Sequence, residues 1–233
     1  MSARFFLRLR APFGAFRPMQ AGVYRATAPV PTFSALWGLA LNLAGIESRG
    51  AAQKEAPPLR LALGVVAPAR VNVLYQQLHG YPVGASGQEF KARTFGSKYW
   101  IAPGRREVLG GIDVVVGVEG APPGFRARLT DGVEGRLDVP TYGLPFLGDN
   151  NFMLDRVDVL DAAPAVRWYT RLDPRAAVRP DSCRLTVAID RENQSRTTSD
   201  LVAPIPAPQA DVPADAWVWT PCAPGAEEIV ARL

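Results

Sequence analysis

The chain has 233 residues and a mass of 25.1 kDa, enough for one large domain or a domain and a half. Its 48% hydrophobic and 21% charged residues are typical of globular proteins and exclude wholesale disorder and collagen-like structure. One histidine and two cysteines, Cys183 and Cys222, are too few for a Cys/His zinc site or a disulfide scaffold, so we expect free thiols in the cytoplasm, no metal and no cofactor.

Positive charge is concentrated in the first half of the sequence. The formal net charge is +4, but residues 1–110 hold 14 Lys and Arg against 4 Asp and Glu, whereas residues 111–233 hold 12 against 18. Nearly all of the cations are arginines, whose planar guanidinium suits phosphates and stacks on bases. The asymmetry suggests a polyanion bound by the first half and a different partner for the second. A GC-rich genome would also explain the arginine content, though less well its uneven placement.

The first predicted element is a strand at residues 3–10, where residue types alternate with a period of two. One face carries Phe5, Leu7 and Leu9, and the other carries Phe6, Arg8 and Arg10. If the sheet is covered on one side only, the first set is buried and the second is exposed.

A helix is predicted at residues 34–46, with Thr32 or Ser34 as its N-cap. Because this segment is apolar almost all round, we expect the helix to be deeply buried. Residues 59–66 alternate again and predict the next strand.

Residues 67–111 form a long excursion before the next clear strand, at 112–118. Cations and aromatic residues are interleaved in it: Arg70, Lys91, Arg93, Lys98, Arg105 and Arg106 with Tyr75, Tyr81, Phe90, Phe95, Tyr99 and Trp100. An insertion of this length is more often functional than passive. Its composition suits single-stranded nucleic acid, because aromatic rings stack on bases and cations bind the backbone. A solvated β-hairpin with a small core of its own is the alternative.

A short helix at 123–131, with proline in its first turn, and a strand at 153–161 complete the order strand, helix, strand, strand, helix, strand. This is the βαββαβ plan of α+β ferredoxin-like and RNA-recognition folds. We therefore expect a ferredoxin-like domain at 1–161 with the insertion at about 67–111, followed by a β-rich extension at 162–233.

A glycine-rich stretch, Tyr142 to Phe152, leads into the strand predicted at 153–161. Glycine and asparagine allow positive φ and close backbone approach, and exposed amides in such a loop can bind a phosphate. The stretch lacks the Lys-Ser/Thr of a nucleotide-binding P-loop, which excludes that class of NTPase. An ordinary glycine-rich turn would have the same composition.

Three stretches together resemble the Cas five family, the subunit that caps the 5′ end of the guide RNA in CRISPR Cascade complexes, and especially its DevS-like branch. They are the opening strand with its continuation Pro-Phe-Gly-Ala-Phe-Arg to Arg17, the segment from Arg25 to Leu39 with its Trp-Gly-Leu ending, and the glycine-rich stretch. The last is similar to the loop of the wider repeat-associated (RAMP) superfamily. The motifs are degenerate and specific only as a set, and they cover most of residues 1–160.

The resemblance implies a ferredoxin-like body with a projecting β-hairpin thumb within residues 67–111. It implies three groups of RNA-binding residues: Arg17, Arg25 and Thr27 beside the first strand; Lys91, Arg93, Lys98, Tyr99, Trp100, Arg105 and Arg106 in the thumb; and Gly143, Gly148, Asn150 and Asn151 in the loop. The implied partners are the 5′ handle of crRNA, the Cascade backbone subunit and the large subunit. Contact with target DNA near its flanking motif is left open.

One branch of the family cuts repeat RNA with a tyrosine, a lysine and a histidine. Here His79 is the only histidine and has no lysine beside it, so Tyr75 and Lys91 could approach it only through folding. We therefore expect a non-catalytic subunit, with no catalytic residue assigned. The alternatives are a metal-free endoribonuclease acting through His79 and a β-rich assembly protein without a nucleic-acid role. No apolar run approaches the ~20 residues of a membrane span, so we expect no membrane partner.

Overall fold

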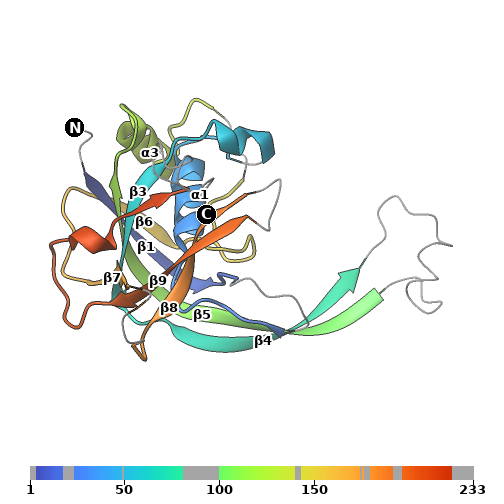
Figure 1. Ribbon diagram of the computed structural model, residues 1–233. Helices are drawn as coiled ribbons and strands as arrows, with labels where there is room; N and C mark the ends of the chain where they lie inside the picture. The colour runs from blue at the N-terminus through green and yellow to red at the C-terminus, as the bar shows by residue number, and fades with distance from the viewer. Residues whose placement is uncertain are drawn as a thin grey trace.

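The computed structural model describes most of the chain. The described residues are 4–17, 24–48, 50–80, 100–139, 143–173, 175, 179–190 and 196–221. Within them the protein is a mixed α/β structure with one sheet of ten strands and two α-helices (Figure 1). The pairs along the sheet are antiparallel, except that β2 runs parallel to β5. No helix in these residues is long and apolar enough to cross a membrane.

Four strands and two helices make up the central body: β1 (Phe5–Gly14), α1 (Phe33–Leu43), β3 (Leu59–Ala67), β5 (Trp100–Glu119), α3 (Phe125–Val133) and β6 (Arg156–Leu160). The strands lie in the order β6-β1-β5-β3. Because β5 is antiparallel to both β1 and β3, these two run parallel, and α1 connects them. In the same way β6 is parallel to β5 across β1, and α3 connects that pair. The body therefore consists of two interleaved β-α-β units.

Both helices cover the same face of the sheet. Leu41 of α1 and Leu129 of α3 belong to one core with Phe5, Leu7 and Leu9 of β1, as the alternation of β1 predicted. Burial of such side chains from water is the main favourable contribution to the folding of this body. The helices thus cover one face of the sheet, where Leu185 and Val202 from the C-terminal part of the chain join the same core.

The bounds of the two helices differ from those expected from the sequence. The Thr32 hydroxyl caps α1 by accepting a hydrogen bond from the amide of Ala35 at 3.3 Å, and the helix ends early because Gly45 turns the chain with a φ of 64°. The cap of α3 is Gly124, with a φ of 79°. The prolines at 122 and 123 therefore precede this helix instead of occupying its first turn, which corrects the sequence prediction.

The other face of the sheet is covered as well, which corrects the expected exposure of Phe6. The Phe6 side chain is only 6% exposed and packs with Trp168 and Trp217 in a second apolar cluster. Its ring lies 6.2 Å from that of Trp168. Arg8 and Arg10 stay half-buried on this face, in ion pairs with Asp113 and Asp158 at 2.7 and 2.9 Å.

The C-terminal strands continue the same sheet. They are β7 (Arg167–Arg171), β8 (Cys183–Ile189), β9 (Thr197–Pro204) and β10 (Val218–Thr220). The order beyond β3 is β7-β9-β8, and β10 also pairs with β3. Short 3-10 helices lie at Gly50–Lys54 and Ala214–Ala216. Residues 162–221 therefore extend the body's sheet and cover its second face, to which they contribute Trp168 and Trp217.

A long hairpin of β4 (Arg70–Gly80) and β5 projects from the body (Figure 1). Its register runs from Arg70 opposite Gly110 to Gly80 opposite Trp100. The strand expected at 112–118 is thus the inner part of a 20-residue strand that crosses from the hairpin into the centre of the sheet. This continuity couples the hairpin mechanically to the core.

Candidate nucleic-acid interface

Three strands meet at the base of the hairpin. The two-residue strand β2 (Tyr24–Arg25) runs parallel to β5 and places Tyr24 opposite Arg105 and Arg25 opposite Arg106. On the other side of β5, β4 places Tyr75 opposite Arg105. Residues that are far apart in the sequence thus lie side by side in one small sheet.

The two adjacent arginines of β5 have opposite environments. Successive side chains of a strand point to opposite faces, so Arg105 and Arg106 lie on different faces of the hairpin. The Arg105 side chain is exposed and has no ion-pair partner among the described residues. Arg106 is buried, with an exposed fraction of 5%. Of these two arginines, only Arg105 therefore offers its guanidinium to a ligand.

Arg106 forms an ion pair with Asp149 of the glycine-rich loop. The distance from its Nη2 to Oδ2 of Asp149 is 2.5 Å, and the guanidinium also lies 5.4 Å from the centre of the Phe152 ring. Burial alone would raise the pKa of Asp149, but hydrogen bonds from Arg106 and from the amide of Asn151 outweigh it and lower the pKa below its usual value. Asp149 is therefore charged in the folded protein and links the loop to the hairpin.

The loop is fixed to β1 at Gly148, whose φ is 75°. A side chain here would be impossible without movement, because an added Cβ would lie 2.2 Å from the backbone oxygen of Ala15. The adjacent Leu147 carbonyl accepts a hydrogen bond from the amide of Ala15 at 3.3 Å. All four of the loop residues predicted from the sequence are exposed: Gly143, Gly148, Asn150 and Asn151.

Thr27 and β2 are anchored by Glu107. One Glu107 oxygen accepts a hydrogen bond from the Tyr24 hydroxyl at 2.6 Å, and the other accepts one from the Thr27 amide at 2.9 Å. The Thr27 hydroxyl accepts a hydrogen bond from the amide of Phe16 at 2.9 Å. Thr27 therefore joins the end of β1 to the hairpin and is engaged within the protein.

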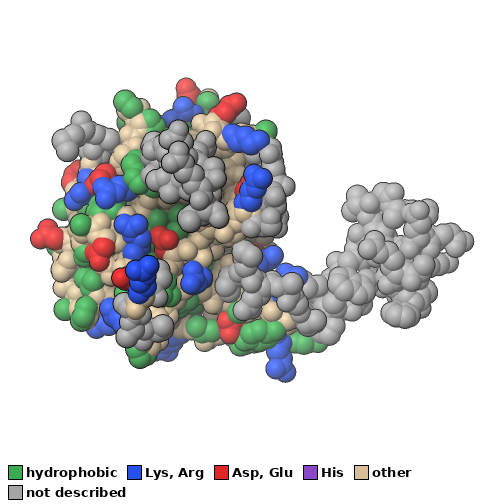
Figure 2. Space-filling view, viewed as in Figure 1, with side chains coloured by type: hydrophobic (Ala, Val, Ile, Leu, Met, Phe, Trp, Pro, Cys, Tyr) green, Lys and Arg blue, Asp and Glu red, His purple; other side chains and the backbone are tan. Residues whose placement is uncertain are grey.

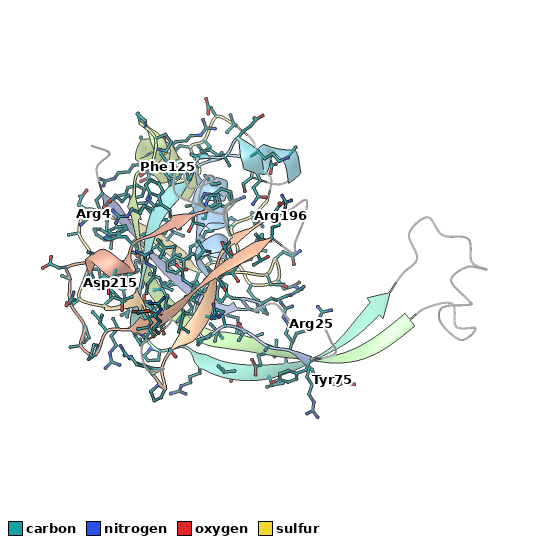
Figure 3. The ribbon with its side chains drawn as sticks, viewed as in Figure 1. Arg4, Arg25, Tyr75, Phe125, Arg196 and Asp215 are labelled. Carbon is teal, nitrogen blue, oxygen red and sulfur yellow. The ribbon has the colours of Figure 1, made fainter. Side chains whose placement is uncertain are left out.

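The structure brings together most of the described residues that the sequence singled out. Arg25, Arg105 and Arg106 lie on neighbouring strands at the hairpin base, where Figure 3 labels Arg25, and Thr27 follows β2. Gly148, Asn150 and Asn151 belong to the loop held by Asp149. Arg17 is exposed just beyond β1, and Gly143 accepts a hydrogen bond from Asn42 through its carbonyl. Trp100 is the first residue of β5, opposite Gly80. Lys91, Arg93, Lys98 and Tyr99 lie outside the described residues.

Sequence reasoning missed several residues of this region. Tyr24 and Glu107 belong to no sequence pattern that marks them, and Asp149 lies in the glycine-rich stretch without being distinguished there, because each acts through a partner far away in the sequence. The structure describes only part of the candidate catalytic group of Tyr75, His79 and Lys91. Tyr75 is exposed on β4, and His79, also on β4, lies opposite Ile101 of β5. Lys91 lies outside the described residues.

Exposed apolar side chains accompany the arginines. Val71, Val73 and Tyr75 of β4 are each more than half exposed, at 53%, 55% and 67%. Figure 2 shows hydrophobic side chains along the lower edge of the hairpin base, with Lys or Arg side chains beside them. The combination of the unpaired Arg105 guanidinium with the exposed Tyr75 ring differs from an ordinary solvated strand face.

Comparison with known proteins yields structural matches only. No protein-family model matches the chain, and no curated protein matches its sequence. A chain of a solved structure described as a CRISPR RNA-guided surveillance complex superimposes with a TM-score of 0.59 at 19% identity, over 91% of this chain and 92% of that one. A second structure, described as a Cas protein, gives a TM-score of 0.48 at 17% identity, over 90% and 97% of the two chains. The first match shows that this chain shares its fold with a chain of such a complex.

Proposed function

We propose that this chain is a non-catalytic subunit of a type I CRISPR Cascade effector, of the Cas five family and its DevS-like branch, that binds the 5′ handle of crRNA. The resemblance of three sequence stretches and the shared fold with a chain of an RNA-guided surveillance complex support this proposal. The strand order β6-β1-β5-β3, with both helices on one face, supports a ferredoxin-like body with a thumb.

One observation carries the proposal: segments that the sequence linked to RNA binding converge at the hairpin base. Arg25 is aligned with Arg106 across β2 and β5, and Asp149 joins the glycine-rich loop to the same point. In this interface Arg25 and Arg105 contact phosphates, the loop follows the RNA backbone, and Thr27 and Arg106 hold the two segments in place.

The handle is one partner, and Cascade subunits are the others. We assign the backbone subunit and the large subunit to surfaces outside the hairpin base, in an assembly that carries out RNA-guided antiviral DNA interference. Whether the target DNA near its flanking motif also contacts this chain is part of the same proposal and needs the assembled complex.

A salt-titrated binding assay with labelled CRISPR repeat RNA tests the proposal. Binding through phosphates releases counterions, so affinity should fall steeply between about 50 and about 200 mM salt. A denaturing gel of the same samples reports whether the RNA stays intact. Tight, salt-dependent binding of intact RNA is the expected result.

Two outcomes contradict the proposal. If the wild type cuts the RNA without added metal and the His79→Ala variant does not, the protein is the endoribonuclease instead. An absence of binding that persists when Cascade partners are added would exclude the handle-binding role and leave the assembly protein.

A further inference from the structure

Three side chains form a ladder across the hairpin base, on the face opposite to Arg106. Arg105 of β5 is paired with Tyr24 of β2 on one side and with Tyr75 of β4 on the other. Residues opposite each other in neighbouring strands share a face, with Cβ atoms about 5 Å apart. The Arg105 guanidinium is therefore flanked by two tyrosine rings.

The ladder is open to solvent. Tyr24 is 48% exposed and Tyr75 is 67% exposed, and the Arg105 side chain is exposed between them. Neither tyrosine belongs to the apolar clusters of the body. Figure 3 places Tyr75 at the hairpin base, on the opposite side of the ribbon from Arg25, in agreement with the register that aligns Arg25 with Arg106.

Hydrogen bonds set the charge of this face. The Tyr24 hydroxyl donates to Glu107 at 2.6 Å, which holds the ring in place, and Glu107 also accepts from the amide of Thr27. Within the paired stretches of these strands (24–25, 70–80 and 100–110), Glu107 is the only acidic residue, and its carboxylate is thus engaged within the protein. Arg105 has no ion pair within the described part of the chain and is available to an anion.

We propose that Tyr24, Arg105 and Tyr75 form a stacking platform for single-stranded RNA, in which two unpaired bases stack on the tyrosine rings and the phosphate backbone between them binds Arg105. The idea rests on the proposed function and specifies which groups of the RNA this face recognises. Stacking on exposed aromatic rings is tolerant of sequence because every base has a π-face.

The spacing of the rings selects a single strand. Tyr24 and Tyr75 lie on strands separated by β5, hence about 10 Å apart, whereas bases stacked in a duplex are about 3.4 Å apart along each strand. Two bases reach both rings only if they are unstacked and splayed outward. A protein partner would have to supply a carboxylate for Arg105, and its apolar contacts alone would leave this cation unpaired.

The test uses the full chain and the labelled repeat RNA, together with the same RNA carrying abasic nucleotides in its unpaired 5′ handle. Tyr75→Ala should weaken binding of the intact RNA about 5- to 100-fold and leave the salt dependence unchanged, and Tyr75→Phe should retain wild-type affinity. Arg105→Gln should reduce the slope of log K against log salt by about 0.7. Val73→Ala, on the same face of β4 and similarly exposed, is the matched control and should bind as the wild type does.

The abasic RNA isolates stacking. The wild type should bind the abasic RNA more weakly than it binds the intact RNA. Tyr75→Ala should bind the abasic RNA with the same affinity as the wild type does. If the wild type binds RNA but Tyr75→Ala behaves like Val73→Ala, the platform is excluded while the proposed function stands. If the wild type binds no RNA, both fail. If Tyr75→Ala and Arg105→Gln keep full RNA affinity and instead lose co-purification with Cascade subunits, the face docks a protein and the platform is again excluded.

Discussion

Arg106 and Asp149 form a buried ion pair that joins two segments 43 residues apart, with side chains exposed by only 6% and 11%. Such a pair adds little stability over an apolar alternative, but the loss of one partner leaves an unpaired charge in a medium that solvates it poorly. The pair therefore acts as a constraint on geometry: the glycine-rich loop has one favourable position against the hairpin, set by this contact.

Asp149→Asn should destabilise the folded protein by about 3 kcal/mol, because it leaves the Arg106 guanidinium buried without a counter-charge. Urea denaturation measures this free energy of unfolding. Asp131→Asn is the matched control, since Asp131 pairs with Arg136 on the surface, where both side chains are about half exposed, at 44% and 58%. Its effect should stay below about 1 kcal/mol. Equal losses in the two variants would contradict the constraint.

The contribution of Asp149 to stability should disappear in acid. Its pKa in the folded protein is lowered, so the stabilisation is complete above the unfolded value of about 4 and is lost as pH falls through the folded value. The difference in unfolding free energy between the wild type and Asp149→Asn should therefore shrink from about pH 6 to about pH 3. Asp158 and Glu119, whose pKa values are also lowered, titrate in both proteins and cancel in the difference. A difference that is constant with pH would assign the pair no electrostatic role.

Local sequence patterns predicted the features that depend on neighbouring residues alone, such as the alternation of a strand and the cap of a helix. The alternation in β1 identified Phe5, Leu7 and Leu9 as core residues, and of the two N-cap candidates, Thr32 and Ser34, it is the hydroxyl of Thr32 that caps α1. The burial of Phe6 could not be predicted in this way. It depends on Trp168 and Trp217, which reach this face only because the C-terminal strands continue the sheet.

The net charges of the two halves of the sequence did not predict where charged side chains lie in the structure. The basic first half and the acidic second half are not two separate faces, because the strands of both halves alternate in the sheet. Asp113, Asp149 and Asp158 of the second half neutralise Arg8, Arg106 and Arg10 of the first. Pairing across strands cannot be read from net charge, so the arginines left free, such as Arg25 and Arg105, become known only from the structure.

Gly148→Ala should lower the free energy of unfolding by more than the strain of an alanine at positive φ. An alanine there meets the backbone oxygen of Ala15, so the loop must move away from β1. Gly135 provides the control: its φ of 70° is similar, but no atom lies within 4 Å of an added Cβ. Gly135→Ala should cost about 1 kcal/mol for the backbone conformation, and Gly148→Ala clearly more than that, measured by urea denaturation. Similar losses would show that the loop is not held against β1.

Arg25 and Arg106 are neighbours across β2 and β5, yet their replacement should affect RNA binding in different ways. Arg25 is half-buried and has no ion pair among the described residues, so Arg25→Gln should remove one phosphate contact. The slope of log K against log salt should then fall by about 0.7 with little loss of stability. Binding of the labelled repeat RNA at several salt concentrations measures both affinity and slope.

Arg106→Gln should weaken binding by releasing the loop, while the slope of log K against log salt stays unchanged, because the Arg106 guanidinium is already neutralised by Asp149. It should also lower the free energy of unfolding, since the Asp149 carboxylate then stays buried without its cation. A reduced slope for Arg106→Gln would mean that the ion pair opens when RNA binds. In that case Arg106 contacts phosphate directly, and the constraint between loop and hairpin exists only in the free protein.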